Sequence, residues 1–205
     1  MGTENAAEDV IAFDLIGRRY DDSFVERDAQ LTEGAWLVDQ RPARVLDLGC
    51  GSGLPTARQL LDAGVEVVGV DESAVMLDLA RAQAPGGTYL HRDLRRIDDL
   101  GEFDAVVAFF SLLMLPKADI PPLLRQLRAQ LRGPKLLLVS MVLGDFDLLP
   151  ISFLGVPTRV SAYPPDELRQ VLADAGFEQF ELREVSAEAE PNRIEVQLYL
   201  RAQAS

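Results

Sequence analysis

The sequence is poor in the residues that build disulfide frameworks and metal centres. Its 205 residues include one cysteine, Cys50, and one histidine, His91. A single cysteine excludes an intrachain disulfide framework and a cysteine-rich zinc site, and a single histidine excludes a cluster of histidine ligands. We therefore predict no metal centre and few catalytic schemes that depend on histidine.

Basic residues are also scarce. The chain has 20 Lys and Arg against 33 Asp and Glu, which gives a formal net charge of −13 at pH 7. Because phosphates need a basic patch and repel an acidic surface at long range, we predict that nucleic acid is not a partner. The charge does not exclude a local cationic pocket inside an acidic exterior.

Long hydrophobic runs are missing as well. No stretch approaches about 18 consecutive apolar residues, so we expect no membrane span. The N-terminus lacks the basic flank and apolar run of a secretory signal, and we expect a cytoplasmic protein. A length of 205 residues and a hydrophobic content of 48% predict one folded domain over residues 1–205.

The sequence does contain short apolar runs that alternate with amphipathic stretches. The runs lie at residues 45–48, 65–70, 103–110 and 136–142, and helical spacing of apolar residues occurs at 54–63, 74–84 and 120–131. Runs of this kind, separated by helices, predict a parallel sheet with right-handed crossovers.

The sequence of the last third of the chain predicts a helix followed by an antiparallel strand pair. Two prolines open a helix over residues 164–175, and Gly176 ends it. Residues 177–185 and 194–201 then have the composition of two strands joined by an acidic loop. We predict that they form an antiparallel pair at the edge of the sheet.

Two further segments are predicted to cover the sheet. Residues 1–42 are interpreted as an N-terminal helical cap. Residues 144–163 form a long connection without clear periodicity, and their apolar, aromatic composition favours a folded lid over a solvated linker.

A glycine-rich loop follows the first predicted strand, and an acid precedes it. In Asp47-Leu48-Gly49-Cys50-Gly51-Ser52-Gly53, the third glycine of a dinucleotide fingerprint would fall on Leu54, and a phosphate-binding loop ending in Lys-Ser or Lys-Thr is absent. Asp47 disfavours a pyrophosphate beside the loop and suits a cationic amine. Asp71 ends the second strand, 20 residues after Gly51, where a carboxylate accepts hydrogen bonds from a ribose diol.

Taken together, these motifs resemble those of the class I S-adenosylmethionine-dependent methyltransferases, in particular the small-molecule type. The resemblance runs through residues 45–53, 68–71, 91–94, 103–107 and 164–177. It implies an α/β fold, a Rossmann-like three-layer sandwich whose seven-stranded sheet is mostly parallel with an antiparallel C-terminal strand. It also implies a cofactor, S-adenosylmethionine, at the carboxyl ends of the first strands.

The resemblance also implies a role for individual residues. Asp47 would serve the ammonium group of the cofactor, Asp71 its ribose hydroxyls, and Asp93 its adenine amino group. The full set implied to bind S-adenosylmethionine, or its product S-adenosylhomocysteine (SAH), is Tyr20, Asp47, Gly49, Cys50, Gly51, Gly53, Asp71, Glu72, Met76, Asp93, Leu94 and Phe109. The alternatives are a packing role for Cys50, a surface position for Tyr20 and a solvated loop around Asp93.

An acceptor pocket is predicted from the loops beyond the strands. Its candidate residues are Phe110, Ser111, Met114, Phe146, Phe153, Arg159 and Tyr163, for which the alternative is a place in the hydrophobic core. No catalytic residue is assigned. His91 falls near the adenine by the resemblance, and relatives often carry histidine where this chain has Met114.

The sequence therefore predicts transfer of a methyl group from S-adenosylmethionine to an oxygen, nitrogen or sulfur atom of a small molecule. One alternative is a protein of the same fold that binds the cofactor but catalyses another reaction, such as a cyclisation. Another is a non-catalytic partner protein, and a third, a nicotinamide-dependent oxidoreductase, is disfavoured by Leu54. The acceptor and the oligomeric state are left open.

Overall fold

The computed structural model describes residues 11–23, 27–190 and 193–204 of the chain. The strands are β1 (Arg44–Leu48), β2 (Glu66–Asp71), β3 (Thr88–His91), β4 (Phe103–Phe109), β5 (Leu131–Val142), β6 (Phe146–Phe153), β7 (Val156–Ala162), β8 (Phe177–Glu190) and β9 (Arg193–Ala204). The helices are α1 (Ala12–Ile16), α2 (Arg19–Ser23), α3 (Asp28–Asp39), α4 (Thr56–Asp62), α5 (Ala74–Gln83), α6 (Ile120–Gln130) and α7 (Pro165–Asp174), with short 3₁₀ turns η1 (Leu112–Met114) and η2 (Lys117–Asp119).

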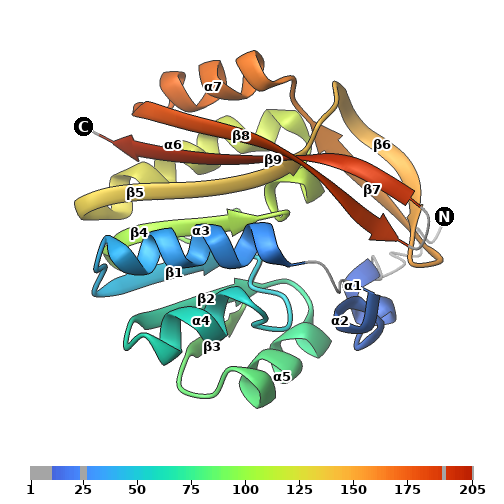
Figure 1. Ribbon diagram of the computed structural model, residues 1–205, viewed down its shortest axis with the longest axis horizontal. Helices are drawn as coiled ribbons and strands as arrows, with labels where there is room; N and C mark the ends of the chain where they lie inside the picture. The colour runs from blue at the N-terminus through green and yellow to red at the C-terminus, as the bar shows by residue number, and fades with distance from the viewer. Residues whose placement is uncertain (1–10, 24–26, 191–192, 205) are drawn as a thin grey trace, which may run out of the picture.

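Seven strands form one sheet in the order β3-β2-β1-β4-β5-β9-β8 (Figure 1). β1 pairs in parallel with β2 and β4, β2 with β3, and β4 with β5, whereas β9 is antiparallel to both β5 and β8. The predicted fold class, a mostly parallel seven-stranded sheet with an antiparallel C-terminal strand, is confirmed.

Helices cover both faces of this sheet because successive strand residues point to opposite sides. Leu46 and Val68 belong to a buried cluster with Leu123 of α6, whereas Val45 belongs to a second buried cluster with Leu60 of α4. The two clusters make the three-layer sandwich that the alternation of strands and helices predicts. No helix within the described part of the chain is long and apolar enough to span a bilayer.

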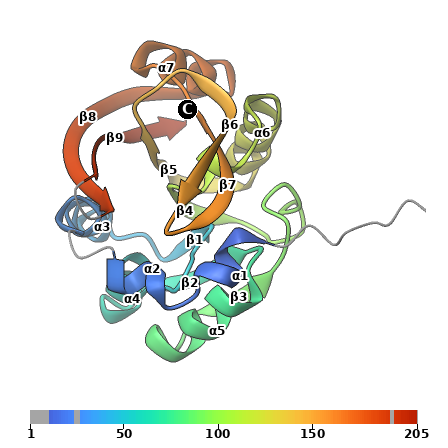
Figure 2. The same ribbon diagram turned by 90° about the vertical axis from the view of Figure 1, so that its right-hand side faces the viewer.

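The segment predicted as a lid, residues 144–163, folds into an antiparallel hairpin of β6 and β7 that forms its own two-stranded sheet. Figure 2 shows the hairpin at the end of the main sheet, with α1 and α2 below it. The register shifts between Phe146 and Leu149, which interrupts the two-residue alternation that marks a strand. This shift explains why the sequence shows no clear periodicity here.

The predicted helical cap, residues 1–42, contains α1, α2 and α3, although residues 1–10 and 24–26 lie outside the described part of the chain. The C-terminal strands are longer than predicted. β8 continues to Glu190 and β9 begins at Arg193, so most of the predicted acidic loop is strand. The extension carries the start of β9 beyond the main sheet toward the hairpin (Figure 1).

A buried acid ties α3 to this C-terminal ribbon. Glu33 is only 3% exposed, and its carboxylate accepts hydrogen bonds from Arg201 Nε (2.6 Å) and Arg183 Nη2 (3.0 Å). We expect Glu33→Gln to lower the free energy of unfolding by about 2 kcal/mol, because the buried charge that both arginines contact is removed, while Arg201 keeps its ion pair with Glu181 and Arg183 still reaches solvent. Urea denaturation measures this, with exposed Glu66→Gln as the control; a loss below about 0.5 kcal/mol would contradict the buried ion pair.

Candidate functional site

The glycine-rich loop between β1 and α4 folds back onto the end of β2. The amides of Gly49 and Cys50 both donate to the carbonyl oxygen of Val70, at 2.7 and 3.0 Å. Gly49 has φ +73°, and a Cβ added there would lie 2.3 Å from Cβ of Ser111, so only glycine fits. A Cβ added to Gly51 would meet no atom within 4 Å, which leaves open space beside the loop.

Asp47 is buried beneath this loop without full hydrogen bonding. Asp47 is only 3% exposed, and no described residue donates a hydrogen bond to its Oδ2 atom. Burial raises the pKa of Asp47 to about 7, and the neighbouring charge of Asp71 adds to the increase. A buried, unpartnered carboxylate oxygen of this kind is a site for a cationic or hydrogen-bond-donating group.

Asp71 and Glu72 follow at the end of β2. Asp71 accepts hydrogen bonds from the amides of Gly51 (Oδ2, 2.8 Å) and Ser73 (Oδ1, 2.9 Å), and each oxygen keeps capacity for another donor. Burial raises the pKa of Asp71, although these amides oppose the increase. Glu72 accepts from the Leu94 amide at 3.2 Å, and burial raises its pKa too.

A cavity of about 440 Å³ lies at the carboxyl ends of β1, β2 and β4. It is lined by Ile11, Ala12, Phe13, Tyr20, Gly49, Gly51, Asp71, Glu72, Met76, Leu94, Phe109, Phe110, Ser111, Met114, Pro157, Thr158 and Arg159. A smaller cavity of about 30 Å³ is lined in part by Asp47, Gly49, Cys50, Gly51, Tyr20 and Phe109. The two together bring most of the residues predicted for the cofactor to one place.

Two predicted cofactor residues line neither cavity. Gly53 has φ +81° and packs against α5, where an added Cβ would lie 3.2 Å from Cα of Ala80. Asp93 forms an ion pair with Arg95 at 2.7 Å, and hydrogen bonds from Arg95 lower the pKa of Asp93 to about 2. The structure therefore gives Gly53 a packing contact and Asp93 a partner on its own loop.

The N-terminal cap is fastened over the loop by polar contacts. Asp21 of α2 accepts from Ser52 Oγ at 2.7 Å, from Gln83 Nε2 at 3.0 Å and from Arg27 Nη2 at 2.7 Å. These contacts hold Tyr20, which lines every one of the cavities described in this section. Burial raises the pKa of Tyr20 to about 12, so its phenol is neutral at physiological pH.

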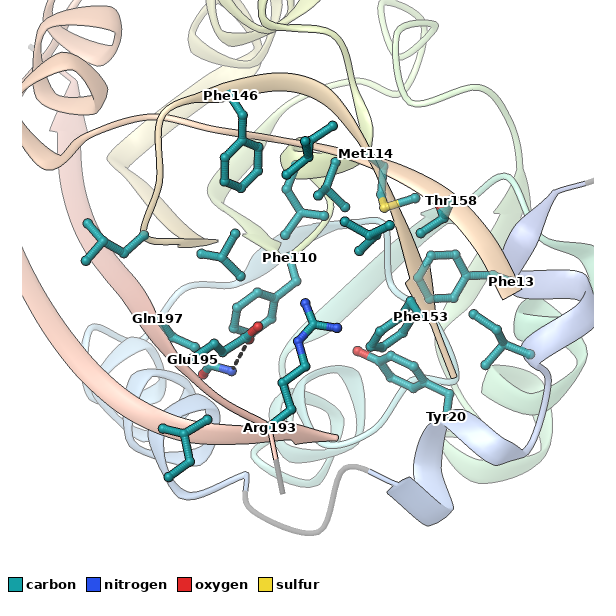
Figure 3. A pocket seen from close by; sticks show the side chains of 18 residues that line it. Phe13, Tyr20, Phe110, Met114, Phe146, Phe153, Thr158, Arg193, Glu195 and Gln197 are labelled. Carbon is teal, nitrogen blue, oxygen red and sulfur yellow. Dashed lines mark hydrogen bonds between the residues drawn. The ribbon is translucent and has the colours of Figure 1, made fainter. Parts of the chain in front are cut away.

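A third cavity, of about 350 Å³, adjoins the first and shares Phe13, Tyr20, Phe110, Met114 and Thr158 with it (Figure 3). Its other lining residues are Ile16, Leu113, Val142, Leu143, Phe146, Leu149, Ile151, Phe153, Val160, Arg193, Ile194, Glu195 and Gln197. The walls are mainly aliphatic and aromatic. We call this the apolar cavity.

The residues predicted for an acceptor pocket divide among three places. Phe110, Met114, Phe146 and Phe153 line the apolar cavity. Ser111 and Arg159 instead line the larger cavity. Tyr163 lines none of these cavities, because its ring is buried in the core and its hydroxyl donates to the Lys117 carbonyl oxygen at 3.0 Å.

Phe110 lies between the two large cavities in a strained backbone conformation. Its φ of +54° falls in the left-handed region, which non-glycine residues rarely adopt. The amide of Phe110 donates to both the carbonyl oxygen (3.1 Å) and Oγ (3.0 Å) of Ser140, and its ring meets Tyr199 edge to face at 5.9 Å. Surrounding contacts that hold such a conformation are a feature of functional sites.

Sequence reasoning missed the contributions of α1 and of the start of β9. Phe13 and Ile16 are three residues apart on α1, and this short apolar face was the signal that could have placed α1 over the cavities beside the predicted Tyr20. Arg193, Glu195 and Gln197 alternate along β9, but nothing local in the sequence brings them to the hairpin.

Comparison with known proteins then identifies the central part of the chain. Residues 45–133 match the family model described as a methyltransferase domain. This segment, less than half of the chain, is therefore similar to methyltransferase domains. The resemblance drawn from the motifs of the first four strands is thereby confirmed, and the matched segment contains the glycine-rich loop, Asp47 and Asp71.

Individual relatives agree with this assignment. Over 93 residues, the chain is 38% identical to a magnesium-protoporphyrin O-methyltransferase of Rhodobacter capsulatus, which covers 43% of this chain and 41% of that protein. The chain spans about half the length of the curated relatives it matches, with 41% to 51% covered in three of them.

Solved structures share the fold over most of the chain. The magnesium protoporphyrin IX methyltransferase of Synechocystis PCC 6803 with bound SAH is 22% identical, with a TM-score of 0.69 and coverage of 87% of this chain and 83% of that one. A Burkholderia thailandensis 1,6-didemethyltoxoflavin-N1-methyltransferase, with its substrate and SAH bound, is 21% identical, with a TM-score of 0.69 and coverage of 92% and 81%.

Proposed function

We propose that this protein transfers a methyl group from S-adenosylmethionine to an oxygen, nitrogen or sulfur atom of a small-molecule acceptor. The observation that carries the proposal is the arrangement of Asp47 and Asp71 around the glycine-rich loop, at one end of paired cavities. The family of residues 45–133 supports it, as do the related folds whose structures contain SAH.

The residues present fit this cofactor. The unpartnered Oδ2 of Asp47 would accept from the ammonium group, and the free acceptor capacity of Asp71 would serve the ribose diol. Glu72, Met76 and Leu94 line the same cavity on the side of β2 and α5, where the adenosine would lie. When bound, S-adenosylmethionine supplies a methyl group made electrophilic by its sulfonium sulfur.

The chain's own contribution is to orient the reactants and to exclude water. Tyr20, Phe110 and Met114 form the shared wall of the two large cavities, so an acceptor in the apolar cavity would face the cofactor across them. An apolar wall between the two cavities aligns the reacting groups and excludes water. Alignment and removal of solvent together supply much of the rate acceleration of a displacement reaction. The aromatic rings of this wall also present electron-rich faces, which attract a positive charge.

The cap and the hairpin are proposed to cover the site. Residues of α1, α2 and β7 line both large cavities, and residues of β6 line the apolar cavity, so both segments contribute to the enclosure of the two ligands. We infer a single domain for residues 1–205 on this basis. We also propose a cytoplasmic location, with which the free, buried Cys50 is compatible. The acidic surface favours a small molecule over nucleic acid as the acceptor.

Mass spectrometry of a turnover reaction tests the proposal. The protein is incubated with S-adenosylmethionine and a panel of apolar phenols, amines, thiols and carboxylic acids, and both products are quantified. Methyl transfer gives an acceptor heavier by one methylene unit together with an equal amount of SAH. An isobaric product would indicate cyclisation, and no product with tight binding of a protein partner would indicate a non-catalytic role; either result overturns the proposal.

A further inference from the structure

The apolar cavity contains charged groups from one strand. Arg193 and Glu195 of β9 are the charged residues among those that line it, while most of the remaining wall is aliphatic or aromatic. Figure 3 shows the side chain of Arg193 extending from β9 into the cavity, with its guanidinium group among the rings of Phe110, Phe153 and Tyr20 in this view. A guanidinium group has five N–H donors, so it can keep a protein partner and still donate to a ligand.

Glu195 is held differently. Its Oε1 accepts a hydrogen bond from Gln197 Nε2 at 3.0 Å, and Oε1 of Gln197 accepts in turn from the hydroxyl of Tyr199 at 3.0 Å. This chain of hydrogen bonds fastens the carboxylate of Glu195 along its own strand. Gln197 thus occupies one carboxylate oxygen of Glu195, while the guanidinium group of Arg193 extends into the cavity (Figure 3).

Arg193 belongs to the lining of the apolar cavity and not to that of the proposed cofactor cavity. The shared wall is formed by Phe13, Tyr20, Phe110, Met114 and Thr158. An acceptor bound in the apolar cavity would thus contact both Arg193 and the shared wall.

Some aliphatic side chains that line the apolar cavity are also partly exposed to solvent. Leu143 is 41% exposed, Leu149 is 43% exposed and Ile194 is 76% exposed, and all three line the cavity. Exposed large aliphatic side chains in the lining of a cavity favour an apolar ligand, which would cover them. We therefore expect the acceptor to have an apolar body.

We propose that Arg193 recognises an anionic group of the methyl acceptor, so that the substrate class is an apolar organic acid. This inference rests on the proposed function for its reaction, but the recognition itself is a property of the cavity. The acid group is bound by Arg193, the apolar body fills the cavity, and the atom that receives the methyl group faces the shared wall. The pocket provides a local cation in a protein whose net charge is −13.

Calorimetry with three probes of the same shape tests the recognition. 2-Naphthoate, 2-naphthamide and 2-naphthamidine carry negative, zero and positive charge and are titrated into the whole chain, with and without saturating SAH. Naphthoate is expected to bind about ten- to a hundredfold more tightly than naphthamide. The reason is that hydrogen bonds between two charged groups contribute more to the binding free energy than hydrogen bonds to a neutral amide. Arg193→Gln should remove this preference and leave naphthamide affinity within twofold, whereas the exposed α7 variant Arg169→Gln should change neither.

Two results would overturn the inference. The first is equal binding of naphthoate and naphthamide, or a preference for naphthoate that survives Arg193→Gln. The second is tightest binding of naphthamidine that is lost in Glu195→Gln, since the glutamate would then recognise a cation. Failure of SAH to bind would contradict the proposed function, while the charge preference measured without SAH would still decide the role of Arg193.

Discussion

Replacing Asp71 with asparagine is expected to weaken SAH binding by about a hundredfold or more. The carboxylate has acceptor capacity left after its bonds to the amides of Gly51 and Ser73, and the proposed ribose diol uses it. A hydrogen bond to a charged group contributes about 1.5–3 kcal/mol, and the loss of two such bonds corresponds to roughly two factors of ten in affinity. Isothermal titration with SAH measures the change.

The matched control is Asp78→Asn on the exposed side of α5, where Asp78 forms an ion pair with Arg81 at 2.8 Å. It should leave SAH affinity unchanged. Thermal unfolding of both variants without ligand separates a local loss of binding from a collapse of the loop. If Asp71→Asn folds and binds SAH within about threefold of the original protein, the ribose role assigned to Asp71 is wrong.

Replacing Asp47 with asparagine is expected to stabilise the ligand-free protein at pH 8 by as much as about 4 kcal/mol. The pKa of Asp47 rises from 3.8 to about 7 on folding, and each pKa unit corresponds to about 1.4 kcal/mol. Because the folded state prefers the protonated carboxyl, Asp47 imposes no penalty below pH 4. The penalty grows as pH rises through the interval from about 4 to 7 and is complete above it. Urea denaturation at pH 5 and pH 8 measures the difference between the two proteins.

The same substitution should have the opposite effect on ligand binding. The ammonium group of SAH is proposed to bind the ionised carboxylate of Asp47, whose pKa is about 7. In the original protein, SAH affinity should therefore increase as pH rises from about 6 to 8. In Asp47→Asn the affinity should be lower and independent of pH over this interval. A variant that gains no stability at pH 8 and keeps the pH dependence would contradict a buried, unpaired Asp47.

The parts of the fold that the sequence predicts are those with local signals. The parallel strands are visible in the sequence as continuous apolar runs. Gly49 and Asp71 mark the ends of two of these strands, because a tight turn and a strand end each restrict the residue type at a single position. The β6–β7 hairpin escapes prediction because the register shift at Phe146 removes its alternation.

The acceptor side of the site was less predictable because distant segments build it. Tyr163 follows the hairpin and is aromatic, but its packing in the core depends on Lys117, which no local pattern connects to it. Arg193 and Phe13 meet at one cavity although they come from opposite ends of the chain. Sequence spacing identifies the cofactor loop, whereas the acceptor pocket requires the tertiary fold.

Titration of the whole chain with SAH at pH 8 tests the central claim most directly. We predict saturable binding of one SAH per chain with a dissociation constant in the micromolar range, and no saturable binding of NAD⁺. Absence of SAH binding, or tighter binding of NAD⁺ than of SAH, would contradict the account of a protein built around S-adenosylmethionine.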